Sequence, residues 1–394
     1  MSRPSVLLHH HDLIHPLMLA RDLHRRGYRV EACADRPHSA LRHSRHITAF
    51  HVVPSIDQPE RLAHAICEIV RKRHIGMFLP GTDQVFALAP HHEMLADVAH
   101  YMFEDAPTLA RVHDKLSLQA ILRAAGILTP HAVPWDLGPL PAALHYPVVV
   151  KDVAGCGAID CRVLRNDCDL VAARRQRRAS RVPALLQQFV SGRTLIWMGV
   201  PTNGRLAASL TAERVLLVPA HAGPSVLRHS LILPELDRQC ARILAAVPYR
   251  GFASLDLIQD GEGRFWFLDF NPRFCAALHT SLRCGISFAD VLYQLAHGRA
   301  PALPPQRHNV YSLSLHRLAQ RMVRSPSAFA SSLAALRYAA AAEELFTRDP
   351  LPFLAAAAHR FRAKTKASEP GGAPVPAYSD GTHGTQRPQS RTHL

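Results

Sequence analysis

The sequence lacks several patterns that would assign a function at once. Its eight cysteines include no C-x-x-C pair, so neither a zinc knuckle nor a disulfide framework is indicated. It also contains no G-x-x-x-x-G-K-[ST] loop, no G-x-S-x-G elbow and no H-E-x-x-H motif. These absences argue against P-loop nucleotide chemistry, serine-esterase chemistry and zinc proteolysis.

Long apolar runs are missing as well. No stretch approaches the length of uncharged apolar sequence that is needed to cross a bilayer, and the first residues lack a sustained apolar run. We therefore expect a cytoplasmic protein that does not contact membranes. With 394 residues, of which 48% are hydrophobic and 20% charged, the chain is long enough for two or three packed units.

Acidic residues are scarce relative to basic ones, and the formal net charge is +15. A basic surface attracts nucleic acid, anionic membranes or small polyanions such as ATP. Much of the excess is local, because five arginines lie between positions 174 and 181 and the segment after Arg360 is basic. No aromatic-basic pattern accompanies these residues, so we expect a solvated helix face and a disordered tail, and we do not expect nucleic acid as a partner.

Strand-like and helix-like segments alternate through the first hundred residues. Val6 to Leu8 forms an apolar strand, helical spacing covers 59–74, and a buried strand follows at 75–79. A further helix and strand end near Phe103. This order predicts parallel strands with helical crossovers, in a small open α/β domain whose strand ends form a crevice.

The next helix is well signalled. Asp114 is its predicted cap, apolar residues recur on one face, and Gly126 predicts its end. This helix carries Lys115 at its amino end, and an apolar strand at 147–150 then leads to Lys151.

The rest of the chain predicts the remaining boundaries. A loop with Gly155 and Gly157 precedes a strand-like segment at 185–190, and an alanine-rich helical stretch follows residue 305. We expect an amino-terminal Rossmann-like α/β domain at 1–105, a main domain at 106–300 with a glycine-loop subdomain at about 146–190, a carboxy-terminal helical segment at 301–363, and a disordered basic tail at 364–394.

The most informative stretch is 251–273, which is typical of two strands joined by a tight glycine-rich turn. With the turn centred after residue 262, Asp256 faces Asp269 and Leu257 faces Leu268. Directly opposed side chains have Cβ atoms roughly 4.5–5.5 Å apart. Two partly buried carboxylates so placed repel each other unless a cation or a proton relieves them.

A third oxygen donor belongs to the same face, because Asn271 lies two residues after Asp269. Oxygen ligands of this kind suit Mg²⁺, which also takes phosphate oxygens and water. Arg273 lies two residues further on. Either aspartate alone would suggest a solvated hairpin, but the full set predicts a magnesium site.

Five motifs then follow one another in a recognisable order. They are Asp114-Lys115, a helix ending in GILTP at Pro130, YPVVVK at Lys151, LQQFVSG at Gly192, and LDFNPR at Arg273. Together they resemble the ATP-grasp superfamily, especially the branch shared by carbamoyl-phosphate-synthase-like proteins and carboxylate–amine ligases. The resemblance covers roughly residues 1 to 300.

The resemblance implies an α/β chain, an ATP-grasp fold preceded by a Rossmann-like domain, that activates a carboxylate with ATP as an acyl phosphate. The activated carboxylate is joined to an amine, and ADP and phosphate are released. Its expected partners are a small carboxylate and a small amine, with a homodimer left open. It implies these roles: Lys115 and Lys151 contact ATP phosphates; Gly155 and Gly157 form a loop over them; Gln188, Phe189 and Val190 border the adenine; Asp256, Asp269 and Asn271 hold Mg²⁺ or Mn²⁺; and Arg273 meets the transferring phosphoryl group.

The chain departs from the family pattern in three places. Asp269 and Gln188 stand where glutamate is common, and the loop of Gly155 and Gly157 has few glycines. Two alternatives stay open, namely a bicarbonate-activating enzyme with carbamoyl-phosphate-like chemistry and a non-catalytic ATP-binding sensor. Candidates for substrate contact are Glu213, Arg214, His221 and Arg228.

Overall fold

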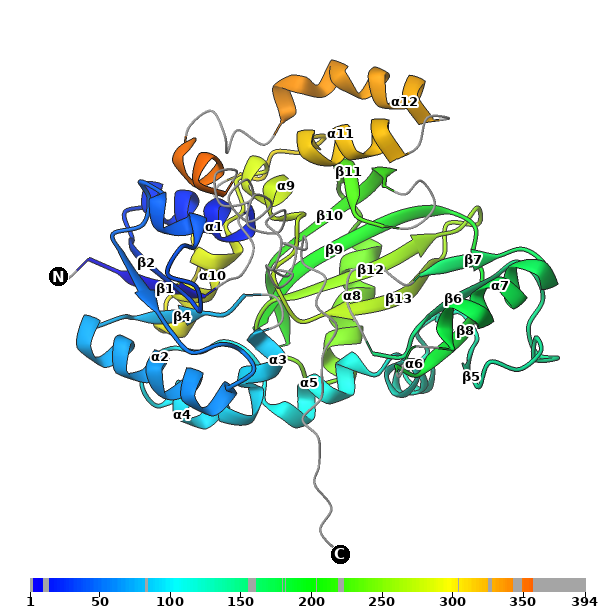
Figure 1. Ribbon diagram of the computed structural model, residues 1–394, viewed down its shortest axis with the longest axis horizontal. Coiled ribbons are helices and arrows are strands. Elements are labelled where there is room, and N and C mark those ends of the chain that lie inside the picture. The colour runs from blue at the N-terminus through cyan, green and yellow to red at the C-terminus, as the bar shows by residue number, and fades with distance from the viewer. Residues whose placement is uncertain are drawn as a thin grey trace, which may run out of the picture.

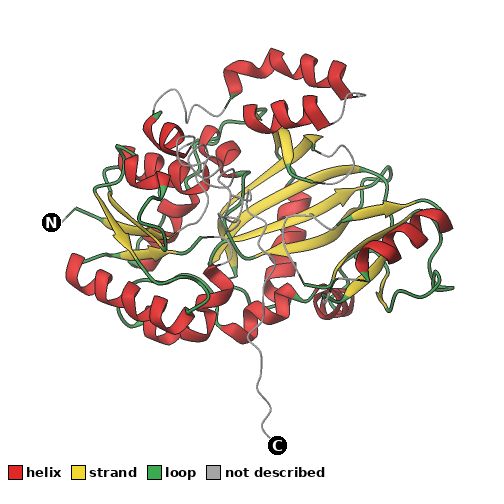
Figure 2. Ribbon diagram, in the orientation of Figure 1, coloured by secondary structure: helices red, strands yellow, loops and turns green. Residues whose placement is uncertain are grey.

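A computed structural model of the chain arranges three sheets side by side, with helices packed against them (Figures 1 and 2). It describes residues 3–9, 14–81, 84–154, 161–178, 180, 182–202, 204–218, 223–303, 305–324, 328–342 and 349–356. Within these ranges, no helix is long and apolar enough to cross a membrane.

The amino-terminal sheet is parallel, as the alternation of the first hundred residues predicts, and its strand order is β3-β2-β1-β4. Its strands are β1 (Ser5–His9), β2 (Arg29–Ala34), β3 (Ala49–Val52) and β4 (Met77–Leu79). Its helices are α1 (Ile14–Arg25), α2 (Pro59–Arg73), α3 (Gln84–Leu88) and α4 (His92–Ala96), with short 3₁₀ turns η1 (Ala40–His43) and η2 (Ala89–His91). Two details differ from prediction: β3 was not expected, and the strand expected near Phe103 is reduced to a single bridge between Met77 and His100.

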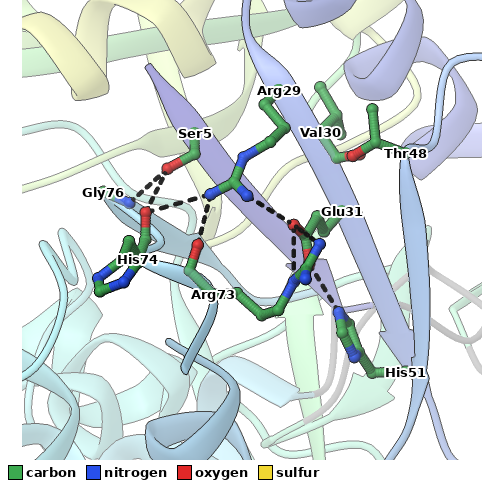
Figure 3. A network of polar contacts seen from close by, with 9 residues as sticks. All are labelled: Ser5, Arg29, Val30, Glu31, Thr48, His51, Arg73, His74 and Gly76. Atoms are coloured by element: carbon green, nitrogen blue, oxygen red, sulfur yellow. Dashed lines mark hydrogen bonds and ion pairs between the residues drawn. The ribbon is translucent and has the colours of Figure 1, made fainter. Parts of the chain in front are cut away.

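A buried carboxylate ties this sheet to helix α2. The side chain of Glu31 on β2 is 0% exposed, and it accepts hydrogen bonds from Arg73 Nε and Nη2 at 3.1–3.2 Å. His51 Nε2 lies 2.7 Å and Arg29 Nη1 3.2 Å from the same carboxylate (Figure 3). Strands β2 and β3 and helix α2 are thus linked through one residue, Glu31.

Helices α5 (Ala106–His113) and α6 (Lys115–Ala124) lead into a small antiparallel sheet of order β5-β8-β6-β7. Its elements are β5 (Ala132–Trp135), β6 (Val148–Asp152), β7 (Arg162–Leu164), α7 (Asp167–Arg177) and β8 (Ala184–Gln188). The predicted cap of α6 is confirmed, because the Asp114 carboxylate accepts hydrogen bonds from the backbone N–H groups of Leu116 and Ser117. This lobe packs around its own apolar cluster.

The third sheet is antiparallel and six-stranded, with the order β13-β12-β9-β10-β11-β14. Its strands are β9 (Arg193–Thr202), β10 (Arg205–Leu217), β11 (Ser225–Leu231), β12 (Ala253–Gln259), β13 (Phe265–Asn271) and β14 (Tyr311–Leu313). The helices around it are α8 (Pro234–Ala246), α9 (Leu278–Arg283), α10 (Phe288–Ala296), α11 (Leu315–Arg324) and α12 (Phe329–Ala334), followed by η4 (Ala335–Ala341). The segment after residue 301, which was predicted to be helical, therefore also supplies strand β14, which pairs with β11.

The large sheet shares its apolar core with the amino-terminal sheet. Helices α1, α9 and α10 lie between the two (Figure 1). The small sheet stands at the opposite side of the large one, beside β13. The edge of the large sheet at β13 is consequently the place where the small sheet meets the large one.

Candidate active site

The hairpin of β12 and β13 brings the predicted carboxylates together. Asp256 pairs directly with Asp269, and Ser254 pairs with Asn271. The predicted facing of the two aspartates is therefore confirmed. The side chains of Asp256 and Asp269 are 25% and 22% exposed, so both are partly shielded from water.

The predicted facing of Leu257 and Leu268 is wrong. Leu257 pairs with Phe267, because the register shifts by one residue between Asp256 and Leu257. The shift is a β-bulge that leaves Leu268 as the extra residue on β13, outside the regular ladder. Its carbonyl oxygen instead accepts a hydrogen bond from Lys151 Nζ at 3.1 Å.

Two buried lysines converge on this edge of the hairpin. Lys151 comes from the end of β6 and Lys115 from the first turn of α6, and they are 9% and 6% exposed. Lys115 Nζ lies 3.7 Å from Asp269 Oδ1. A backbone hydrogen bond from Lys115 N to the Val153 carbonyl joins the segments that carry the two lysines. Burial lowers the pKa of Lys151, and the charge of Asp269 opposes this effect.

Asp256 has the environment of a cation ligand. Its Oδ2 accepts a hydrogen bond from Asn271 Nδ2 at 3.2 Å, and Arg214 Nη1 lies 3.6 Å from its Oδ1. Burial raises the pKa of Asp256; the negative charge of Asp269 adds to this, while the arginine charges oppose it. Two opposed carboxylates with an amide oxygen beside them fit a hard divalent cation, which would relieve their mutual repulsion.

Arg273 lies just beyond these donors. Its Nη1 donates to the Phe274 carbonyl at 3.5 Å, and its charge acts to lower the pKa of Asp256. The charge of the same guanidinium also contributes to lowering the pKa of His113, at the end of α5. The structure thus brings Arg273 together with the aspartates and the two lysines.

Sequence reasoning missed His113. Burial lowers its pKa to about 4, and the charge of Lys115 contributes. Its ring lies 4.4 Å from that of Phe86, measured between centroids. A lone histidine two residues before a lysine gives no signal in the sequence, so only the packing of α5 against the hairpin reveals it.

The residues expected at the adenine lie at the other end of the small sheet. Gln188 pairs with Val148, three residues before Lys151 on β6, a separation of about 10 Å along the strand. Gln188 Oε1 accepts a hydrogen bond from His131 N at 3.2 Å, and Phe189 is 38% exposed. A hollow of about 360 Å³ is lined here by His131, Ala143, Leu144, His145, Tyr146, Pro147, Gln188 and Phe189. Val190 follows directly and is half-buried.

The remaining candidates separate into two groups. Arg214 reaches Asp256 and is paired across the strands with Arg228. Glu213 lies on the other face, where its carboxylate is 3.8 Å from Arg193 Nη1. The predicted loop residues Gly155 and Gly157, and the candidate His221, lie outside the described residues.

Known proteins resemble the chain in part of its sequence and in its fold. No family model matches the chain. Over 179 residues it is 27% identical to the D-alanine–D-alanine ligases of Stutzerimonas stutzeri (strain A1501) and Pseudomonas entomophila (strain L48), a match of 40% of this chain and 54% of each relative. The chain therefore spans about half the length of the curated relatives it matches.

Solved structures match most of the chain at low identity. An N5-carboxyaminoimidazole ribonucleotide synthetase in complex with ADP has a TM-score of 0.63 at 14% identity, covering 82% of this chain and 85% of its own. The L-amino acid ligase of Bacillus licheniformis has a TM-score of 0.58 at 15% identity, covering 77% and 76%. The biotin carboxylase of Campylobacter jejuni has a TM-score of 0.61 at 15% identity, covering 79% and 74%. The chain thus shares the fold of these structures, and the curated relatives and the order of the motifs agree with the resemblance to the ATP-grasp superfamily.

Proposed function

We propose that the chain is an ADP-forming ligase that activates a small carboxylate with ATP and joins it to an amine. The observation that carries the proposal is the meeting of three elements, α6, β6 and β13, at one point. Lys115 and Lys151 arrive from α6 and β6, and both lie against the Asp269 edge of the large sheet. Two buried ammonium groups beside a carboxylate pair suit a triphosphate and its cation.

The nucleotide would lie along the small sheet. Its phosphates would meet Lys115 and Lys151, and its base would enter the hollow beside Gln188 and Phe189. The separation of about 10 Å between Gln188 and Lys151 along the sheet supports this placement. Backbone groups from Gln188 to Val190 would border the base.

Asp256, Asp269 and Asn271 would hold the divalent cation. Bound there, Mg²⁺ or Mn²⁺ would neutralise phosphate charge and fix the geometry of the phosphate oxygens. The protein's own cations would add to this, because Lys151 is held by the Leu268 carbonyl at the same edge.

The reaction then requires little covalent help from the protein. An oxygen of the substrate carboxylate attacks the terminal phosphorus of ATP, and the bond from that phosphorus to the bridging oxygen of ADP breaks. The amine next attacks the acyl carbon, loses a proton, and phosphate leaves. Arg273 would neutralise the charge that develops on the transferring group, where a fixed guanidinium has its largest effect.

A screen of pooled carboxylates and amines for ADP release tests the proposal. Full-length protein with Mg-ATP should release ADP and phosphate only with its carboxylate, and hydroxylamine should trap the acyl phosphate as a hydroxamate. Lys151→Met should abolish this release, whereas Lys72→Met, an exposed lysine on α2, should leave it unchanged. AMP and pyrophosphate as products would refute the acyl-phosphate route.

Two other outcomes would redirect the assignment. ADP release that depends on bicarbonate alone would favour a carbamoyl-phosphate-like reaction. ATP binding without cleavage across the whole screen would favour a non-catalytic sensor.

A further inference from the structure

A second group of cations lies beyond Arg214 on the same face of the large sheet. Arg214 reaches Asp256, and Arg228 on β11 stands directly opposite Arg214. Opposed residues share a face, so Arg228 points to the side that carries the carboxylates. Arg228 is only 1% exposed, and its Nη2 donates to the Ser225 carbonyl at 3.3 Å.

Helix α9 covers this part of the sheet. Arg228 pairs on its other side with Ser312 of β14, whose hydroxyl lies 2.7 Å from the Thr280 hydroxyl on α9. His279 and Arg283 flank Thr280, one residue before it and three after it. They occupy positions four apart, which lie on one face of a helix.

His279 lies within the electrostatic influence of these cations. Its pKa is lowered to about 3, first by burial and then by the charges of Arg228, Arg283 and Arg21. Arg21 belongs to α1, which packs beside α9 (Figure 1). We call Arg21, Arg228, His279 and Arg283 the cationic cluster. Its four members come from a helix of the amino-terminal domain, a strand of the large sheet and α9.

The cationic cluster adjoins the active site. The segment after Arg273 runs into α9, and on the way Cys275 Sγ lies 3.5 Å from the hydroxyl of Ser254, the residue opposite Asn271. The charges of Arg228 and Arg273 both act on the pKa of Cys275, which burial raises. The segment from Asn271 to His279 therefore leads directly from the carboxylate pair to the cluster.

One member of the cluster, Arg283, borders a hollow large enough for a small molecule. Arg283 lines a hollow of about 600 Å³ together with Leu282, Gly285, Pro305, Gln306 and Arg307. Within the described residues, two buried nitrogens of the cluster that could bind an anion have no hydrogen-bond partner, namely His279 Nδ1 and Arg283 Nε. Like charges gathered in partly buried positions are costly, and an anion among them offsets that cost.

We infer that the cationic cluster binds an anionic group, a carboxylate or a phosphate, which the substrate carries in addition to the carboxylate that is activated. The inference rests on the proposed function and narrows its substrate class to molecules with at least two anionic groups. His279, which is neutral, would donate one hydrogen bond, and the arginines would supply charge-assisted ones.

Calorimetric titration tests this binding with full-length protein saturated with Mg²⁺ and a non-hydrolysable ATP analogue, so that the nucleotide site is filled. Inorganic phosphate and glutarate serve as separate probes, with acetate as the monoanionic comparison. One of the two dianions should bind. Arg283→Gln should weaken its affinity about tenfold to hundredfold, which is the loss typical of one charged hydrogen bond. Arg283→Lys should retain part of the affinity.

Two further variants control the result. His279→Gln should weaken the binding of the same dianion. Arg238→Gln, on an exposed face of α8, should leave this binding unchanged. Binding of the ATP analogue should be equal in all variants, so loss of nucleotide binding by the parent would count against the proposed function and not against the cluster. If neither dianion binds the parent, or if Arg283→Gln and Arg238→Gln behave alike, the inference is wrong.

Discussion

Replacing Glu31 by glutamine should destabilise the amino-terminal sheet and leave the candidate active site unchanged. The substitution keeps the shape of the side chain and removes its charge. Arg73, Arg29 and His51 would then surround a neutral amide, where they now surround a carboxylate that is 0% exposed (Figure 3). The amide nitrogen would also face donors, with which it cannot form a hydrogen bond.

The contacts set the size of the loss. Breaking a fully buried ion pair costs about 3–5 kcal/mol, and a hydrogen bond to a charged group contributes about 1.5–3 kcal/mol. Here the side chains of Arg29 and Arg73 are 30% and 41% exposed, so water recovers part of their interaction. We therefore expect Glu31→Gln to lower the free energy of unfolding of this sheet by about 2 kcal/mol.

The pH dependence has a definite sign. Burial, the largest influence, raises the pKa of Glu31, but the hydrogen bonds from Arg73 and His51 and the arginine charges outweigh it, so the pKa is lowered overall. The stabilisation is therefore complete above the pKa of an unfolded glutamate, about 4.3, and is lost as the pH falls through the lower folded value. The difference between parent and Glu31→Gln should be full at pH 7 and shrink below pH about 4.

Hydrogen exchange at pH 7 measures this locally, which is necessary because a chain with several lobes need not unfold in one step. The amides of β1, β2 and β3 should exchange faster in Glu31→Gln, and those of β9 and β12 should not. Glu68→Gln, an exposed carboxylate on the same helix as Arg73, is the matched control. Equal protection in the two variants would refute the role given to the buried carboxylate.

The other predictions concern the active site and the buried histidines. Asp269→Asn should weaken nucleotide binding in Mg²⁺ while leaving the fold intact, because it halves the charge of the carboxylate pair; equal calorimetric affinity in parent and variant would exclude the proposed ligand set. Arg273→Ala should reduce turnover far more than ATP affinity, since its contact strengthens as charge develops, and a proportional loss of both would contradict that role. Burial, the main cause, lowers the pKa of His279 to about 3 and that of His113 to about 4, so stability should fall as the pH drops below about 6.5, by at most about 1.4 kcal/mol per histidine and pH unit. Urea unfolding between pH 7 and pH 5 checks this, and an unchanged slope in His279→Gln would speak against it.

Local signals in the sequence were sufficient where neighbouring residues decide the structure. The cap at Asp114 and the facing of Asp256 and Asp269 both depend on short-range spacing, and both are observed. The bulge that moves Leu268 out of register was not predictable in the same way. It is stabilised by Lys151, a residue more than a hundred positions away, whose ammonium group binds the displaced carbonyl.

Long-range pairing explains the other misses. Strand β14 has only three residues, and it is a strand because β11 lies next to it. His113 is buried by the meeting of α5 with β13, and the sequence gives no spacing that signals it. The cationic cluster likewise combines α1, β11 and α9, so its members appear in the sequence as unrelated basic residues.

Several of the basic residues that produce the positive net charge are buried. Part of the net charge of +15 is held inside the molecule, because Lys115, Lys151 and Arg228 are all less than a tenth exposed. Desolvated cations favour anionic ligands much more strongly than surface lysines do, because water screens them less. Nucleotide and substrate should therefore stabilise the folded chain well beyond the effect of added salt, in proportion to the logarithm of their concentration over the dissociation constant. The cationic cluster is linked to the carboxylate pair through Arg214, which contacts Asp256 and stands opposite Arg228. Two bare polyanions bound at the two groups of cations would repel each other. Binding of one ligand should therefore favour binding of the other only if a divalent cation is bound with them.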